Sequence, residues 1–394
     1  MRRILGGADL AEERVALVRC PSYERAVVRA ALRQALAGLG GMAAFVRPGQ
    51  RVLVKANLLT RRTPEAAVTT HPALVRAVVE EVQQAGGHPV LYDSPGGPFT
   101  ERSLRAVYEA SGLAEVAAAT GAELNFDLGA VERSHLPGAL FQGVTLSRAV
   151  AEAEVIINLP KLKTHGLTRY TGAVKNLFGC IPGLTKAEYH LRLPELTHFS
   201  RFLVELAQLV RPALTVMDAV VGMEGEGPSA GRPRHLGFIL ASPSLFALDQ
   251  VAVALIGLSA DAVPTTRLAR EAGLVPPLDE IAVLGEDLAA VAVHDFAVPP
   301  PGGTSFRLLG RQVSLGSLKL AARWLQPRPV FDPERCRRCG VCLKNCPAQA
   351  LTLGPRRPAV ELERCIRCFC CQELCPAQAV AIHRPVLARW LFRS

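Results

Sequence analysis

The chain alternates between short apolar runs and longer stretches in which apolar residues recur every three or four positions. The first pattern is typical of buried strands, and the second of helices with one apolar face. Strands are therefore expected at 15–20, 51–59, 88–92, 122–126, 154–160, 213–217, 235–242 and 280–287. Helices are expected at 23–39, 71–87, 101–118, 195–210 and 245–256.

The segment 51–92 shows how these elements are connected. A strand, a helix with Pro72 in its first turn, a Gly86-Gly87 stop and a second strand follow one another. This order is a βαβ unit, whose two strands lie parallel. The pattern predicts an α/β fold with a mostly parallel sheet and flanking helices.

Eight cysteines near the C-terminal end repeat one spacing. Between Cys336 and Pro376 the motif C-x2-C-x2-C-x3-C-P occurs twice, as in bacterial-type ferredoxins, where the fourth cysteine binds the other cluster. The spacing predicts two [4Fe–4S] clusters, with these ligands: Cys336, Cys339, Cys342 and Cys375 for one, and Cys365, Cys368, Cys371 and Cys346 for the other. Zinc would not explain the proline after each motif. Disulfides need an oxidising compartment, and the N-terminus has no secretory signal.

The cysteine motifs divide the chain. We expect the α/β domain at 1–300, a linker at 301–329 with a short helix near 318–324, and a small α+β ferredoxin domain at 330–384. Residues 385–394 would form a basic amphipathic tail, which packs onto the adjoining domain or touches a membrane surface.

The net charge of +10 is unevenly distributed. Residues 303–394 hold sixteen Lys or Arg and five Asp or Glu, a net of +11, so residues 1–302 are close to neutral. Arginines beside the cysteines would offset cluster charge and offer a docking face to an acidic redox partner. No nucleic-acid-binding motif accompanies them, which argues against DNA or RNA. Because no apolar run reaches the ~20 residues of a membrane span, a cytoplasmic protein is expected.

Polar side chains follow three predicted strands, in loops at 55–57, 93–97 and 161–175. The carboxyl ends of parallel strands meet, so these loops should converge on a ligand. The candidates for binding an anionic substrate are Lys55, Asn57, His71, Asp93, Lys161, Asn176, Asp218 and Glu224, and the candidates for catalysis are Lys163, His165, Lys175 and Cys180. The alternative is a solvated basic loop. Nucleotide-binding spacings are incomplete, and a flavin or a further metal stays open.

Several of these residues allow a second interpretation. Asp218 and Glu224 could bind a hard cation or act as a base, or could serve only in capping and turn formation. Cys180 could be a nucleophile beside cations or a buried small residue. Cys370 interrupts the second cysteine motif and is interpreted as a packed thiol outside the ligand set.

Three blocks resemble the domain-of-unknown-function 362 family. They are TTHPALVRAVVE with YDSPGG, LPKLKTH with TGAVKNLFGC, and MDAVVGMEGEGPSAGRPRHLG with the later ALDQVA. The resemblance implies an α/β domain fused to a two-cluster ferredoxin module, and marks Asp249 as a further motif position. It carries no catalytic role with it.

Three functions fit these observations. The first is an iron–sulfur oxidoreductase that relays electrons between the clusters and an anionic substrate, with Lys163 and Lys175 holding the anion and His165 donating a proton. The second is a non-catalytic electron carrier or adaptor. The third is a metal-centre assembly factor, in which Asp218, Glu224 and Cys180 would handle the metal.

Overall fold

The computed structural model describes residues 13–134, 137–300, 307–308, 311–312 and 326–385. The first part of the chain contains β1 (Arg14–Arg19), α1 (Arg25–Ala37), β2 (Arg51–Lys55), α2 (Pro72–Gln84), β3 (His88–Tyr92), α3 (Glu101–Ala110), α4 (Leu113–Thr120), β4 (Glu123–Leu124), β5 (Ala130–Ser134), β6 (Gly143–Ser147), α5 (Arg148–Ala151), β7 (Val155–Asn158), β8 (Lys161–His165), β9 (Arg169–Thr171) and α6 (Ala173–Asn176). It continues with α7 (Thr185–Arg192), α8 (Leu196–Val210), β10 (Leu214–Glu224), β11 (Arg232–Ser242), α9 (Leu245–Leu255), α10 (Pro264–Glu271), β12 (Ala282–Gly285), α11 (Leu288–Val291), β13 (Arg307–Leu308) and β14 (Arg311–Gln312). The C-terminal part contains β15 (Arg328–Phe331), α13 (Val341–Lys344), β16 (Leu351–Leu353), β17 (Pro358–Val360), α14 (Cys370–Glu373) and β18 (Val380–His383).

One large sheet organises the α/β unit, in the order β12-β1-β11-β10-β7-β2-β3-β4, with β8 paired to β10 and β9 paired to β8. The pairs β3–β4, β2–β3, β2–β7, β7–β10, β8–β10 and β1–β12 are parallel. β11 runs antiparallel between β1 and β10, and β9 runs antiparallel to β8. The predicted α/β class with a mostly parallel sheet is confirmed.

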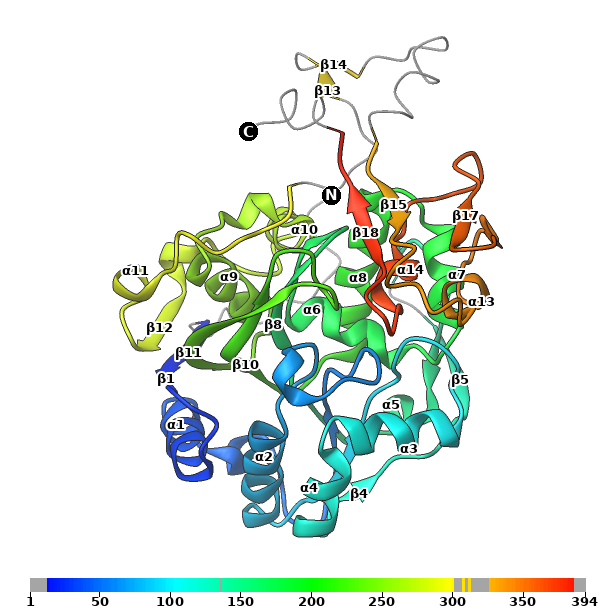
Figure 1. Cartoon of the computed structure of the whole chain (residues 1–394). Coiled ribbons are helices and arrows are strands. Elements are labelled where there is room, and N and C mark those ends of the chain that lie inside the picture. The colour runs from blue at the N-terminus through cyan, green and yellow to red at the C-terminus, as the bar shows by residue number, and fades with distance from the viewer. Residues whose placement is uncertain (1–12, 135–136, 301–306, 309–310, 313–325, 386–394) are drawn as a thin grey trace.

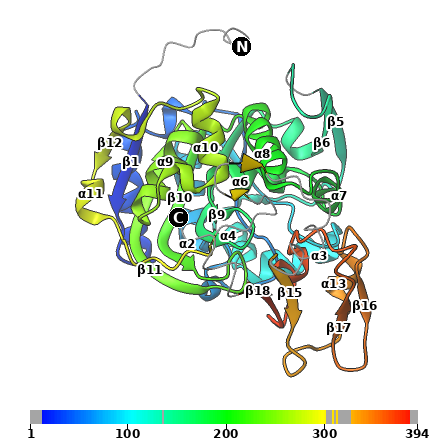
Figure 2. The same cartoon turned by 90° about the horizontal axis from the view of Figure 1, so that it is seen from above.

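Both faces of the sheet are buried, as the apolar strand sequences require. Successive side chains of β1 alternate between two cores, with Val15 and Leu17 in one and Ala16 and Val18 in the other. The second core is closed by residues of α1 to α4, and the first by residues of α6, α8 and α9. Figures 1 and 2 show these two groups of helices on opposite sides of the sheet.

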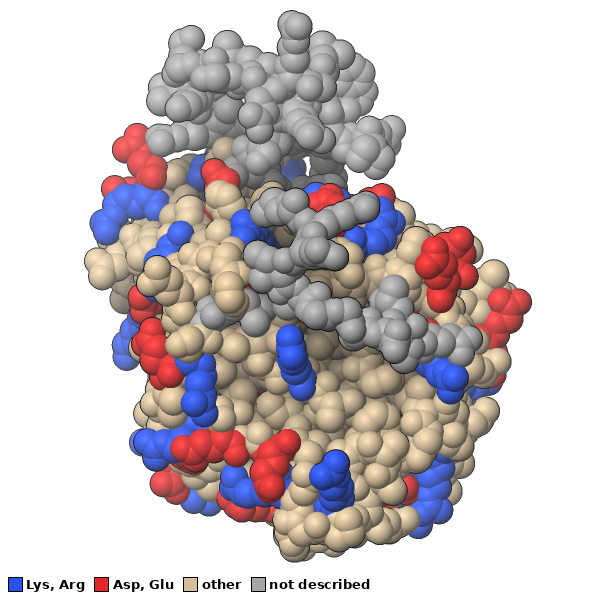
Figure 3. Space-filling model, turned by 180° about the vertical axis from the view of Figure 1, so that it is seen from behind, with Lys and Arg blue, Asp and Glu red and all other residues tan. Residues whose placement is uncertain are grey.

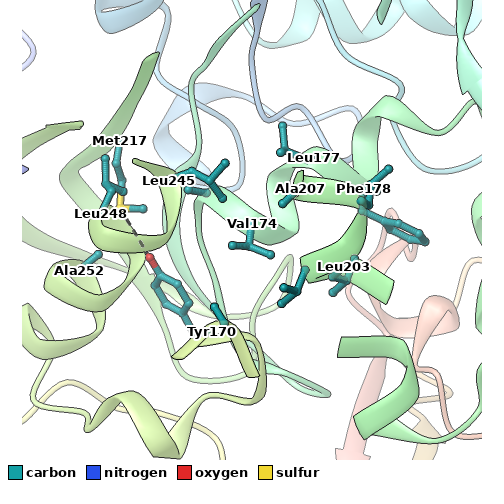
Figure 4. Packing of buried hydrophobic residues seen from close by; sticks show 14 of the residues in the cluster. Tyr170, Val174, Leu177, Phe178, Leu203, Ala207, Met217, Leu245, Leu248 and Ala252 are labelled. Carbon is teal, nitrogen blue, oxygen red and sulfur yellow. Dashed lines mark hydrogen bonds between the residues drawn. The ribbon is translucent and has the colours of Figure 1, made fainter. Parts of the chain in front are cut away.

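The first core fixes the short helix α6, which carries two of the predicted site residues. Val174 packs among apolar residues of α8 and α9, including Leu203 and Leu248 (Figure 4). The carboxylate of Asp249, on α9, accepts hydrogen bonds from the N–H groups of Ala173 (2.7 Å) and Val174 (2.9 Å). Asp249 therefore caps the first turn of α6 and sets the direction of the residues that follow.

The C-terminal unit is small and of the α+β kind, as predicted. β15 pairs antiparallel with β18, and β16 with β17, and each cysteine motif leads into a single helical turn, α13 or α14. This unit packs on the α/β unit beside α7 and α8 (Figure 1).

Hydrogen bonds hold the two units together. The Gln372 amide donates to the Glu226 carbonyl (2.9 Å), and the Gln378 amide donates to the Ser229 carbonyl (2.9 Å). The Arg62 guanidinium donates to the carbonyl oxygens of Cys375 and Pro376, at 2.9 Å each. The cysteine unit is therefore fixed against the loops that follow the strands of the large sheet.

Several sequence expectations need correction. Residues 161–175, expected as a loop, form β8, β9 and most of α6, and the region expected to be irregular contains the β5–β6 hairpin. The helix expected at 101–118 is two helices, because Gly112 adopts a left-handed φ of 77° between α3 and α4.

The expected linker helix at 318–324 and all of the tail after Pro385 lie outside the described residues. Within the described part of the chain, no helix combines the length and the apolar character that crossing a membrane requires.

Candidate functional site

Parallel strands β7, β2 and β3 lie side by side and end at the same edge of the sheet. Lys55, the last residue of β2, is fully buried, and its ammonium contacts the Asp93 carboxylate (2.8 Å) that follows β3. The other oxygen of Asp93 accepts from the Leu58 N–H (2.7 Å). A Cβ on Gly179 would come within 2.2 Å of the Asp93 carboxylate, so this approach requires glycine there.

Three asparagines continue this polar network. The Asn57 amide donates to Asn176 Oδ1 (2.7 Å), and the Asn176 amide donates to Asn158 Oδ1 (2.8 Å). Lys55 also reaches Asn176 Oδ1 at 3.3 Å. The predicted residues Lys55, Asn57, Asp93 and Asn176 are therefore brought together, by strand ends and by α6.

Strand β8 presents Lys161, Lys163 and His165 on one face, because side chains two apart in a strand point the same way. All three are about 1% exposed. The Lys163 ammonium donates to Asn57 Oδ1 and to the Val68 carbonyl, at 2.7 Å each, and it contacts no carboxylate among the residues that the structure describes. Burial lowers the pKa of Lys163 to about 7.

A cavity of about 100 Å³ opens where the two units meet. Its walls include Lys163, His165, Thr171, Lys175 and His190 from the α/β unit, and Asn345, Cys370, Glu373 and Leu374 from the C-terminal unit. At roughly 10–15 Å³ for one water, this volume holds several waters or a small organic anion. The α/β residues alone would leave one side of it open.

Lys175 is the cation of this cavity that lacks a hydrogen-bond acceptor. Its Nζ lies 5.5 Å from the ring centre of Phe178 and 5.8 Å from that of Phe199. Within the described residues, no oxygen accepts a hydrogen bond from it. Burial lowers the pKa of Lys175, and the nearby Glu373 carboxylate opposes that effect. An ammonium held between aromatic rings at a cavity wall is suited to bind an anion.

His165 and Glu373 meet across the junction of the units. His165 Nε2 lies 3.0 Å from Glu373 Oε1, but neither atom is aligned for a hydrogen bond. His165 Nδ1 accepts from the N–H groups of Leu167 (3.0 Å) and Thr168 (3.4 Å), so Nε2 carries the hydrogen. The hydroxyl of Thr171, in the same cavity, is also without a partner within the described residues.

The charges of this pair follow from burial and from Lys175. Burial lowers the pKa of His165 to about 4, so the imidazole is uncharged at neutral pH. Burial alone would raise the pKa of Glu373, yet its interactions with the imidazole of His165 and with the ammonium of Lys175 lower it. Because the imidazole is uncharged near neutral pH, Lys175 is the charge that keeps Glu373 ionised. His165 is then a hydrogen-bond donor, not an acid.

A second polar cluster contains predicted residues that the structure does not bring to the cavity. The Asp218 carboxylate accepts from Lys161 Nζ (2.9 Å), the Tyr23 hydroxyl (2.7 Å) and the His71 N–H (2.9 Å). The ring of Tyr23 stacks on that of His71 at 3.5 Å. Burial lowers the pKa of His71 to about 4. Lys161, His71 and Asp218 bind one another, and none of them lines the cavity.

The proposed metal-handling set is not assembled. Glu224 is held by Arg232 (2.7 Å) and by the Ala297 N–H (3.0 Å), and Asp218 by the cluster just described. Cys180 is fully buried, and burial raises its pKa to about 12, which disfavours the thiolate. In the described ranges, no three His, Cys, Asp or Glu side chains surround a point suited to one ion.

The cysteines line two further cavities in the groups that the motif spacing predicts. One is lined by Cys336, Cys339, Cys342 and Cys375, and the other by Cys346, Cys365, Cys368 and Cys371 together with Cys370, which lies outside the predicted ligand sets. The N–H groups of Ala350 and Ala379 donate to the sulfurs of Cys346 and Cys375, at 3.3 Å each. None of the eleven cysteines, all of them described, forms a disulfide. Each cavity therefore has at least the four cysteines that would hold a [4Fe–4S] cluster, and the chemistry that such a cluster would supply is one-electron transfer.

Glu373, Thr171 and Tyr23 belong to these sites but were not predicted from the sequence. Glu373 lies in a spacer of the second cysteine motif, and Tyr23 is 138 residues from the Lys161 that it contacts. One signal was available, namely the alternation in Lys161-Leu162-Lys163-Thr164-His165, which is typical of a strand with one polar face.

Comparison with known proteins agrees with this organisation. The family model described as "Domain of unknown function (DUF362)" matches residues 52–254, and a 4Fe-4S dicluster domain matches residues 328–376. The structure also has a weak likeness to the lactate racemase apoprotein from Thermoanaerobacterium thermosaccharolyticum, with 12% identity and a TM-score of 0.37. That likeness covers 59% of this chain and 55% of the racemase chain.

A curated relative matches most of the chain. The thylakoid-associated protein sll1697 of Synechocystis sp. (strain ATCC 27184 / PCC 6803 / Kazusa) is 40% identical over 272 residues, which are 68% of this chain and 82% of that protein. With the family model covering just over half of the chain, these matches show that this is an iron–sulfur protein of the domain-of-unknown-function 362 family, with a 4Fe-4S dicluster ferredoxin domain at its C-terminal end.

Proposed function

We propose that the protein is an oxidoreductase that exchanges electrons between its clusters and a small anionic molecule in the cavity between the two units. The observation that carries this proposal is the composition of the cavity wall. An ammonium without an acceptor, Lys175, stands on one side, and α14 of the cysteine unit forms the other. A protein that only carried electrons would not need a buried anion site beside its cysteines.

The roles of the binding residues follow from their free hydrogen-bonding positions. Lys175 provides the charge that attracts the anion, and His165 Nε2–H and the Thr171 hydroxyl provide uncharged donors. Hydrogen bonds to ionised groups are the stronger kind, so Lys175 contributes most to affinity. Glu373 repels a second negative charge and favours a ligand with a single one.

Lys163 is the group suited to transfer a proton. Its pKa of about 7 lets it hold a proton and release it near neutral pH, which is where an acid–base catalyst works best. Two of its three hydrogens are held by Asn57 and Val68, and the side chain lines the cavity. Lys163 therefore replaces His165 as the proposed proton donor.

The redox partner belongs to the same proposal. Arg335, Arg337 and Arg338, beside the first cysteine motif, are exposed and would dock an acidic electron-carrying protein. The face of the molecule in Figure 3 shows basic and acidic side chains intermixed, without a field of one sign. A cytoplasmic location is proposed with this partner, and the relative's name adds association with a thylakoid surface as a second location to examine.

Affinity for small anions tests the proposal. The fully loaded protein would be screened anaerobically by thermal shift and calorimetry against mono- and dicarboxylates, phosphate and sulfate. Ligands that bind would then be mixed with protein whose clusters have been reduced, and cluster reoxidation followed by absorbance. We expect at least one anion to bind and to oxidise the clusters.

Variants of Lys175 identify the site. Lys175→Gln should weaken binding by about 10- to 100-fold, which corresponds to a lost charge-assisted hydrogen bond of roughly 1.5–3 kcal/mol. Lys175→Arg should retain most of the affinity, and the exposed Arg47→Gln should behave as wild type. Equal affinity in wild type and Lys175→Gln would exclude this cavity. Binding without cluster oxidation would favour the carrier function over the enzyme.

A further inference from the structure

We infer that the two clusters stand in a fixed order between the cavity and the solvent. The group of Cys346, Cys365, Cys368 and Cys371, here called the inner group, adjoins the substrate cavity. The group of Cys336, Cys339, Cys342 and Cys375, the outer group, faces the docking surface. This order would set the direction in which electrons travel through the protein. The part of the inference that places a substrate beside the inner group rests on the proposed function.

The inner group is joined to the substrate cavity by helix α14. This single turn places Cys370 and Glu373 in the cavity wall, while Cys371 between them belongs to the inner group. Cys370 lines both the substrate cavity and the inner cavity, and no described residue lines both the substrate cavity and the outer cavity. In Figure 1, α14 lies where the cysteine unit meets the α/β unit.

Cys370 lies between the inner group and the substrate cavity. It is buried and outside both groups of four, so it binds no cluster in the predicted scheme. Its side chain fills the wall that separates the inner group from the substrate cavity. A small, polarisable residue keeps this wall thin while it excludes water.

The outer group has the opposite surroundings. Cys339 is exposed, and the cavity that it lines also includes the exposed Arg337 and Arg338. Arginines at this position meet the requirement for docking an acidic partner. A one-electron protein carrier would therefore contact the outer group first, and the bound anion would lie nearest to the inner group, with Cys370 between them.

Electron transfer along this order forms and breaks no bond. Each electron would pass from the reduced carrier to the cluster held by the outer group, then to the cluster held by the inner group, and then to the anion, with each cluster supplying one-electron transfer. An oxidation of the bound molecule would use the same three steps in reverse. For each electron that the anion receives, the carrier gives up one, so both clusters would return to their starting oxidation state.

The order can be tested without any substrate, by removing one charge at either end. Loss of a nearby positive charge disfavours the reduced form of a cluster and lowers its reduction potential. In the full-length loaded protein, Lys175→Gln should reduce the equilibrium constant for reduction of one cluster at least threefold, which is about 28 mV for a one-electron couple. Arg337→Gln should act on the other cluster. Redox titration followed by electron paramagnetic resonance reports both potentials separately.

Controls keep the result interpretable. Lys175→Arg retains the charge and should leave both potentials unchanged. Glu373→Gln removes a negative charge from the same cavity and should raise the potential that Lys175→Gln lowers, and it replaces that variant if Lys175→Gln loses iron. Iron content and circular dichroism establish that each variant is loaded and folded.

The outcomes separate the two proposals. If Lys175→Gln lowers the reduction potential of one cluster and Arg337→Gln lowers that of the other, the order is supported, even if no anion is ever found to bind. If both substitutions move the same cluster, or if Lys175→Gln and Glu373→Gln move neither, the order is wrong. The anion screen described above tests the oxidoreductase independently.

Discussion

Lys161 and Lys163 lie two residues apart on the same face of β8 and are equally buried, yet their surroundings differ. Lys161 contacts the Asp218 carboxylate at 2.9 Å and the Tyr23 hydroxyl at 2.8 Å. In the described part of the chain, Lys163 contacts only uncharged acceptors, Asn57 Oδ1 and the Val68 carbonyl. Depth of burial does not distinguish the two lysines. The presence of a counter-ion does, and it separates a lysine that builds the fold from one that is available for chemistry.

The physical basis is the cost of a charge inside the protein. Burial lowers the pKa of both lysines, but Asp218 opposes this effect at Lys161. A buried charge with a partner is a stable structural unit, whereas one without a partner is readily neutralised and shifts its pKa. The cavity concentrates groups of the second kind, namely Lys163, Lys175 and His165.

The largest expected change in the free energy of unfolding comes from breaking the ion pair of Lys161 and Asp218. Asp218→Ala leaves the Lys161 charge buried and uncompensated, so we expect a loss of about 3–5 kcal/mol of unfolding free energy. The midpoint of urea unfolding, followed by circular dichroism, measures it. Replacing both partners, as in Lys161→Met with Asp218→Leu, should recover most of the loss, because an apolar pair of similar volume is often no less stable. A loss below about 1 kcal/mol in the single variant would contradict the assigned role.

The second effect is a pH dependence that Lys163 should produce. Its pKa is about 7 in the folded protein and ordinarily about 10.4 in an unfolded chain. Between these values the unfolded chain holds a proton that the folded protein has released, so stability should rise with pH, by up to about 1.4 kcal/mol per pH unit. In Lys163→Met this rise is absent. The substitution should therefore stabilise the protein more at pH 7 than at pH 9, in unfolding midpoints measured at both values.

The exposed Lys344 supplies the comparison for this measurement. Lys344→Met should change stability by the same small amount at both pH values. If the wild type and Lys163→Met gave parallel stability curves between pH 7 and 10, the amine of Lys163 would not be buried as described, and its role in proton transfer would fail.

The smallest expected effect distinguishes Lys175 from Lys161. Lys175→Met, made together with Glu373→Gln so that no buried carboxylate loses its cation, breaks no hydrogen bond within the described residues, and the new side chain still packs on Phe178 and Phe199. The lost cation–π contact is worth roughly 0.5–2 kcal/mol, and relief of charge burial offsets it. Unfolding free energy should change by less than about 1 kcal/mol, while Lys161→Met should cost several times more. Similar losses in the two variants would remove the distinction between the two regions.

The sequence predicted those parts of the molecule that depend on local patterns. The β2–α2–β3 unit follows from apolar periodicity with Pro72 and Gly86 as boundaries, and the convergence of Lys55, Asn57 and Asp93 follows from parallel strand ends. Both depend on residues close in sequence and on one general rule of sheet geometry. The order of the elements was therefore accessible without a structure.

What could not be predicted depends on contacts between distant segments. β8 is a buried strand with a polar face, and apolar content alone cannot identify such a strand; its polar side chains are accommodated by Asp218, Asn57 and Glu373, from three other segments. His71, Lys161 and Asp218 were expected at the ligand and instead form a separate cluster around Tyr23. Which polar side chains line the cavity and which form a separate cluster depends on how they are buried, and burial depends on the complete fold.

The shared wall of the cavity has a consequence for maturation of the protein. Glu373 and Cys370 reach the cavity only when the short helix α14 is formed, and α14 holds a predicted cluster ligand, Cys371. A chain that has not received its iron should lack a properly closed site. The anion would then bind only to copies of the protein that carry their clusters and can transfer electrons. Anion affinity measured before and after removal of iron by a chelator would test this dependence.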